Sequence, residues 1–83
     1  MAVEDAYQTR RVQRELTRRY VDCTRIDVKV IHGVCYLSGL MRQLRSHPYI
    51  DLDQEAEIIQ KTIRQIPGIR QVIWDVRLVK RQV

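Results

Sequence analysis

The stretch RIDVKVIHGVCYLSG, from Arg25 to Gly39, decides how the rest of this chain is organised. In its first half, apolar residues alternate with charged ones, which is the period-two pattern of a strand with one buried face. A second β-rich run, residues 34–38, follows after only His32 and Gly33. Glycine adopts the positive φ that a tight hairpin turn requires. The sequence therefore predicts a β-hairpin that turns at His32-Gly33 and ends at Gly39.

The length of the chain limits it to one small domain, residues 1–83. On folding, a domain of this size buries only about 60–65% of the surface that its unfolded chain exposes, so its stability is marginal. Association between copies would add buried surface and is an open alternative. Hydrophobic residues make up 45% and charged residues 30% of the chain, which is typical of a globular domain.

The chain is basic, with 15 Lys and Arg against 10 Asp and Glu and a formal charge of +5. Most of the basic residues are arginine, whose planar guanidinium suits phosphate and carboxylate groups. Anionic partners are therefore worth considering, although the charge balance does not choose between nucleic acid, lipid headgroups and an acidic protein.

The two cysteines, Cys23 and Cys35, are expected to be free thiols in a reducing compartment. The N-terminal residues MAVEDAY have neither the basic nor the apolar region of a secretory signal. No apolar run approaches the roughly 18 residues that a transmembrane helix needs. The predicted location is the cytoplasm, or the periplasm if an export signal has been removed.

A first amphipathic helix is predicted at residues 4–21, with acids in its first turn and arginines in its last, as the helix dipole favours. Residues spaced by three or four form its narrow apolar stripe: Val12, Leu16, Tyr20 and Cys23. The opposite side carries Tyr7 and four arginines: Arg10, Arg11, Arg14 and Arg18. Such a charged face is commonly only solvated, and a contact surface is the alternative.

A second helix is predicted from Asp51, which can cap it together with Gln54, to Ile66, before Pro67-Gly68. Its apolar stripe is uninterrupted: Leu52, Ala56, Ile59, Ile63 and Ile66. The acids at its start are explained by the helix dipole alone: Asp51, Asp53, Glu55 and Glu57.

A last strand is predicted at residues 69–79, and Trp74 on its inner face is interpreted as a core residue rather than a contact at the sheet edge. The order of elements predicts an α+β fold, an αββαβ two-layer sandwich with both helices on one face of a three-stranded sheet. Residues 40–50 are expected to form a basic and aromatic loop without an acid, and residues 80–83 a disordered tail.

Two sets of residues are candidate binding surfaces. The candidate anion-binding residues come from the first helix and from the loop: Arg10, Arg11, Arg14, Arg18, Arg42, Arg45 and Tyr49. The uncovered sheet face combines apolar and charged residues and suggests a partner surface. Its candidate contact residues are Val34, Tyr36, Ile73, Arg77 and Val79.

No catalytic site is predicted, because the three glycines are isolated turn residues and neither Ser38 nor Ser46 lies in a nucleophile-elbow motif. The cysteines and histidines lack the C-x₂₋₄-C and H-x₃₋₅-H spacings of structural zinc sites. We therefore expect a protein that is not an enzyme and holds no metal or cofactor.

The spacing I-x-V-x-V-x-x-G-x-x-x-L-x-G resembles the BON domain of bacterial envelope and stress proteins. It is formed by Ile26, Val28, Val30, Gly33, Leu37 and Gly39. A second signature follows the second helix, formed by Ile66, Pro67, Gly68, Ile69 and Val72. The resemblance covers about residues 8–79 and implies a non-enzymatic αββαβ module that binds phospholipid surfaces or hydrophobic ligands, or mediates assembly. The chain differs from the family in an insertion of about ten residues after residue 42 and in having Trp74-Asp75 where an Asn is usual.

Three functions remain open from the sequence. The first is a binding or adaptor module for an anionic lipid surface, a small ligand or a protein partner, as the resemblance implies. The second is nucleic-acid binding through the basic helix and the open sheet; the intermixed acids and the lack of a G-x-x-G motif argue against it. The third is homo-oligomerisation through the open sheet face or its edge.

Overall fold

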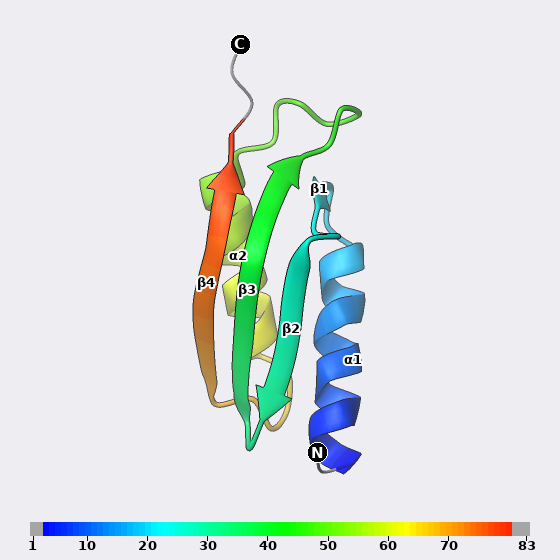
Figure 1. The fold of residues 1–83 in the computed structure, drawn as a ribbon, viewed down its shortest axis with the longest axis vertical. Coiled ribbons are helices and arrows are strands. Elements are labelled where there is room, and N and C mark those ends of the chain that lie inside the picture. The colour runs from blue at the N-terminus through cyan, green and yellow to red at the C-terminus, as the bar shows by residue number, and fades with distance from the viewer. Residues whose placement is uncertain (1–2, 81–83) are drawn as a thin grey trace.

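The computed structural model describes residues 3–80 as an α+β fold with two helices and a four-stranded sheet (Figure 1). The elements are α1 (Val3–Thr17), β1 (Val21–Asp22), β2 (Ile26–Ile31), β3 (Val34–Gln43), α2 (Leu52–Arg64) and β4 (Gln71–Val79). The predicted α+β class is confirmed, but the sheet has a fourth strand, β1, whose first residue, Val21, was predicted to end the first helix.

The sheet is mixed and is centred on β3. β2 pairs with it antiparallel from Ile26 opposite Gly39 to Ile31 opposite Val34. β4 pairs with it parallel along residues 34–42, and β1 pairs antiparallel with residues 42–43. Because β4 occupies one whole edge of β3, β2 and β1 follow each other along the other edge (Figure 1).

The predicted hairpin between β2 and β3 is confirmed. His32 and Gly33 both have positive φ, at 49° and 81°, which matches the tight two-residue turns that join twisted antiparallel strands. The carbonyl of Gly33 also accepts a hydrogen bond from the Arg70 N–H at 2.8 Å, which ties the turn to the start of β4.

The second helix is also confirmed, including its cap. The Asp51 side chain accepts hydrogen bonds from the backbone N–H groups of Asp53 and Gln54, at 2.9 and 3.3 Å. All five residues of its predicted stripe are buried, and they join one core with buried residues of α1, β2 and β3. Trp74 packs against this core but is only half-buried, because it lies on the edge strand β4.

The first helix is shorter than predicted. It ends at Thr17, because Val21 and Asp22 leave the helical path to pair with the end of β3. The prediction that Tyr20 belongs to the core is wrong: its side chain is exposed and its ring lies against that of His47, with centroids 4.7 Å apart.

The predicted loop 40–50 is partly wrong as well. Residues 40–43 continue β3, because Met41 is fully buried and the last residues of β4 pair with this segment. The remaining loop, residues 44–51, is attached to β3 by a hydrogen bond from the Gln43 side chain to the Ile50 carbonyl at 2.8 Å.

At the C-terminal end, β4 begins at Gln71 rather than at residue 69. Lys80 follows it and forms an ion pair with Asp53 at 2.7 Å, and the rest of the predicted tail, residues 81–83, lies outside the described residues. Neither described helix has the length and apolar character needed to cross a membrane.

Candidate functional site

Four arginines lie on the outward side of α1 and of the turn that follows it, and we call this surface the arginine face: Arg10, Arg11, Arg14 and Arg18. Together with Tyr7 and Glu15 they line one cavity of about 350 Å³. The spacing of three and four residues places all of them on one side of the helix. The structure thus brings together the helical half of the predicted anion-binding set.

Positive charge on this face is poorly neutralised. Arg18 forms an ion pair with Glu15 at 3.3 Å, whereas Arg10, Arg11 and Arg14 form none with any described residue. Like charges three or four residues apart on a helix destabilise it by about 0.2–0.5 kcal/mol per pair. A bound anion would relieve this repulsion.

The helix that presents the arginine face is fixed to the sheet by its opposite side. The Asp5 carboxylate accepts a hydrogen bond from the His32 N–H at 3.2 Å, and the Thr9 hydroxyl accepts one from the Val30 N–H at 3.2 Å. Val12 is completely buried beneath them. The arginines therefore project from a helix whose orientation is set by the core.

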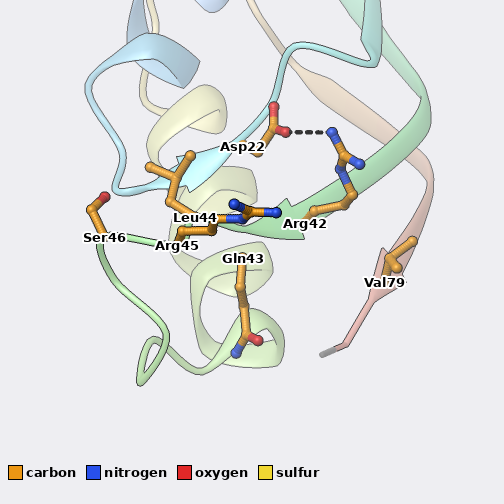
Figure 2. A pocket seen from close by; sticks show the side chains of 7 residues that line it. All are labelled: Asp22, Arg42, Gln43, Leu44, Arg45, Ser46 and Val79. Atoms are coloured by element: carbon orange, nitrogen blue, oxygen red, sulfur yellow. Dashed lines mark hydrogen bonds and ion pairs between the residues drawn. The ribbon is translucent and has the colours of Figure 1, made fainter. Parts of the chain in front are cut away.

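A second cavity, of about 720 Å³, lies at the end of β3, and Figure 2 shows its lining. It is lined by Asp22, Arg42, Gln43, Leu44, Arg45, Ser46 and Val79. Arg42 turns towards Asp22 and forms an ion pair at 2.9 Å, whereas Gln43 points away from both (Figure 2).

The carboxylate of Asp22 is held in its charged form. Its pKa is lowered first by hydrogen bonds from the hydroxyl and the N–H of Thr24, at 2.6 and 3.0 Å, and then by Arg42. Since Arg42 is already engaged with this carboxylate, it is a weaker anion-binding candidate than the unpaired arginines of α1.

The predicted anion-binding set is therefore divided between separate places. The arginine face and the β3 cavity share no lining residue, and Tyr49, which is 98% exposed, lines neither. The five predicted sheet-face residues lie together on the side of the sheet away from the core, where the register places Tyr36 between Lys29 and Ile73.

Two buried acids escaped the sequence analysis. Asp5 fixes α1 to the hairpin, and Glu55 of α2 accepts two hydrogen bonds from Arg19, each at 2.9 Å. The signal for Glu55 was its position, three residues after Leu52 and four before Ile59, which places it within the apolar stripe. Glu55 was overlooked because the sequence prediction attributed all the acids at the start of this helix to the helix dipole.

No group of three or more His, Cys, Asp or Glu side chains within residues 3–80 is placed to hold a metal ion. The cysteines are separate free thiols, Cys35 buried and Cys23 half-buried. Burial raises the pKa of each to about 11, and at Cys23 the nearby carboxylates of Asp22 and Glu55 add to the effect.

These raised pKa values predict slow thiol chemistry. At pH 8, iodoacetamide should alkylate the folded protein about a hundredfold more slowly than the urea-unfolded chain, because so little thiolate is present. Mass spectrometry over time measures this, and equal rates in both states would contradict it. The unfolded thiols ionise first, so the free energy of unfolding should also fall as the pH rises from 9 towards the folded pKa of about 11.

In the comparisons with known proteins, neither a family model nor a curated protein matches this chain.

Proposed function

We propose that this chain is a non-enzymatic binding module whose arginine face attaches to an anionic surface, with phospholipid headgroups as its partner. The observation that carries the proposal is the group of arginines without an ion pair, Arg10, Arg11 and Arg14, on the outward side of a helix that is hydrogen-bonded to the sheet. Each basic residue near an anionic membrane contributes about 1 kcal/mol of attraction.

The shape of the arginine face favours an extended surface over a single small ligand. Arg10 and Arg14 are four residues apart, which corresponds to about 6 Å along the helix, and Arg18 extends the face into the turn after α1. The cavity between the arginines has a mostly polar lining. Several phosphate groups spread over a plane match this arrangement better than one bound anion.

Exposed apolar and aromatic residues continue the face towards the N-terminal end of α1. Val3 is 87% and Tyr7 63% exposed, and their spacing from Arg10 and Arg14 places them on the same side of the helix. Tyrosine is enriched at the headgroup level of membranes, and interfacial helices combine such residues with arginine. This combination favours a lipid surface over nucleic acid, and the resemblance to BON domains points the same way.

Replacing Arg10, Arg11 and Arg14 together by glutamine should weaken binding to vesicles rich in phosphatidylserine by about 3 kcal/mol, roughly a hundredfold. Co-sedimentation at low salt measures the partition coefficient. The matched control replaces three exposed basic residues elsewhere, Lys61, Arg64 and Arg70, by glutamine and has the same net charge.

The control variant should lose much less affinity than the arginine-face variant. Equal losses would mean that net charge alone governs binding, and an unchanged affinity of the arginine-face variant would exclude this surface. Stronger binding to single-stranded oligonucleotides than to vesicles would replace the lipid proposal by the nucleic-acid one.

A further inference from the structure

The two outer edges of the sheet differ in whether their backbone groups have hydrogen-bond partners. Along β2, side chains of α1 accept hydrogen bonds from the edge: Thr9 from the Val30 N–H and Asp5 from the His32 N–H. Along the far edge of β4, no described residue pairs with the backbone. An uncovered edge strand of nine residues is a template for another strand.

The register shows which residues of β4 face this open edge. Ile31 and Val34 flank the two-residue turn as a hydrogen-bonded pair, so the odd-numbered residues of β3 direct their backbone groups towards β4. In the parallel pairing Cys35 lies opposite Val72, so its backbone groups bond to the residues on either side of Val72, Gln71 and Ile73. Successive residues of a strand direct their backbone groups to opposite edges, so the odd-numbered residues of β4 bond to β3. The even-numbered ones present their N–H and C=O groups outward: Val72, Trp74, Val76 and Leu78.

The inner, apolar face of the sheet is also incompletely covered at β4. On β3, the inward side chains of Cys35, Leu37 and Met41 are at most 1% exposed. On β4, by contrast, all four inward side chains, those of the even-numbered residues, are only half-buried. The helices therefore leave an apolar margin along the same edge that lacks a strand partner.

We infer that β4 pairs antiparallel with β4 of a second copy of this chain, about a two-fold axis at Val76. The inference concerns the opposite edge of the sheet from α1 (Figure 1) and does not rest on the proposed anion binding. Such a contact is isologous, and it joins the two sheets into one.

Charge complementarity selects this register. With the axis at Val76, Asp75 lies opposite Arg77 of the second copy, and the two-fold axis repeats the pair. Moving the axis to Asp75 or to Arg77 would place two like charges directly opposite each other, which destabilises a strand pair. Moving it to Trp74 would place Asp75 opposite the apolar Ile73.

The same register matches the apolar residues on both faces. On the outer face, Ile73 lies opposite Val79 of the second copy, and both side chains are more than a third exposed in the single chain. On the inner face, Trp74 lies opposite Leu78, and Val76 opposite its own copy, which covers the half-buried margin of β4. Apolar contacts and reciprocal ion pairs therefore coincide in one alignment.

Sedimentation equilibrium of the full chain over a range of concentrations tests the inference. The wild type should form dimers, and Asp75→Arg, which places arginine opposite arginine twice, should weaken association by at least about tenfold. The exchange Asp75→Arg/Arg77→Asp restores opposite charges and should restore association. The control Asp27→Arg makes the same charge change on the outer face of β2 and should leave it unchanged.

A cross-linking experiment tests the register itself. Residues 75 and 77 face β3 with their backbone groups, so they form non-hydrogen-bonded pairs across the dimer, with Cα atoms about 4.5 Å apart. This separation allows a disulfide. The variant Asp75→Cys/Arg77→Cys should form disulfide-linked dimers on mild oxidation, whereas Asp75→Cys alone should not. A strictly monomeric wild type, or dimers that respond to neither the charge exchange nor the cysteine pair, would overturn the inference.

Discussion

Replacement of Gly39 by alanine is expected to lower the free energy of unfolding by about 4 kcal/mol, a large part of the stability of a domain this small. Gly39 has a φ of 110°, which side-chain-bearing residues rarely adopt. A Cβ atom at this position would also meet the backbone carbonyl oxygen of Arg25. The same carbonyl accepts a hydrogen bond from the Leu40 N–H at 3.2 Å, so it cannot move away without loosening the hairpin.

Urea denaturation followed by circular dichroism measures this effect. The matched control is Ser38→Ala, which changes the exposed neighbouring residue of β3 and should alter stability by less than about 0.5 kcal/mol. Equal stability of Gly39→Ala and Ser38→Ala would contradict the close approach of the Arg25 carbonyl oxygen to Gly39.

Replacement of Arg19 by methionine should lower the free energy of unfolding by about 4 kcal/mol, because it leaves the Glu55 carboxylate buried without a cation. The Glu55 side chain is only 8% exposed, and the ion pair has both oxygens engaged with the guanidinium. This contact joins the end of α1 to the first turn of α2, so its loss should also separate the two helices.

Two further variants distinguish the loss of this contact from general effects. Arg18→Met removes an exposed ion pair with Glu15, whose arginine side chain is 67% exposed, and should cost under about 1 kcal/mol. The double change Arg19→Met/Glu55→Met removes both charges and should be more stable than Arg19→Met alone. Equal losses for the Arg18 and Arg19 variants would show that Glu55 is solvated rather than buried.

The sequence predicted those elements whose local pattern and tertiary environment agree. In α2, the cap at Asp51, the apolar stripe and the stop at Pro67-Gly68 all indicate the same helix, and the structure has it. In β4, the alternation of apolar and charged residues correctly assigned both faces. Two-residue turns such as His32-Gly33 are similarly local, since they depend on backbone preference at two positions.

The errors arose where long-range pairing overrode local preference. The helical pattern of the sequence continues to Val21. In the structure Val21 and Asp22 instead pair with residues 42–43, about twenty positions further along the chain. The sequence had indicated that the strand before residues 42–43 ends at Gly39. Strand β3 passes through Gly39 because pairing with β4 continues beyond it. No local signal in the sequence specifies either pairing.

The candidate site shows the same division. Helical spacing alone predicts that Arg10, Arg11, Arg14 and Arg18 share one face, and in the structure they line one cavity. Two other arginines are paired with distant carboxylates. Arg42 pairs with Asp22, 20 positions away, and Arg19 pairs with Glu55, 36 positions away. Composition counts these arginines as available cations, but it cannot show that a carboxylate already pairs with them.

The proposed anion-binding face and the proposed dimer contact lie at opposite margins of the molecule. In Figure 1, α1 lies beside β2, whereas β4 forms the opposite margin of the sheet. A dimer through β4 therefore leaves both arginine faces free.

Sedimentation with vesicles tests most directly whether an anionic lipid surface is the partner of the arginine face. The wild-type protein is mixed with vesicles containing phosphatidylserine and with purely zwitterionic vesicles, at low and at physiological salt. The protein should bind the anionic vesicles alone, and more weakly at the higher salt because exposed charges are screened. Binding to neither vesicle, or equal binding to both at either salt concentration, would contradict an anionic surface as the partner of the arginine face.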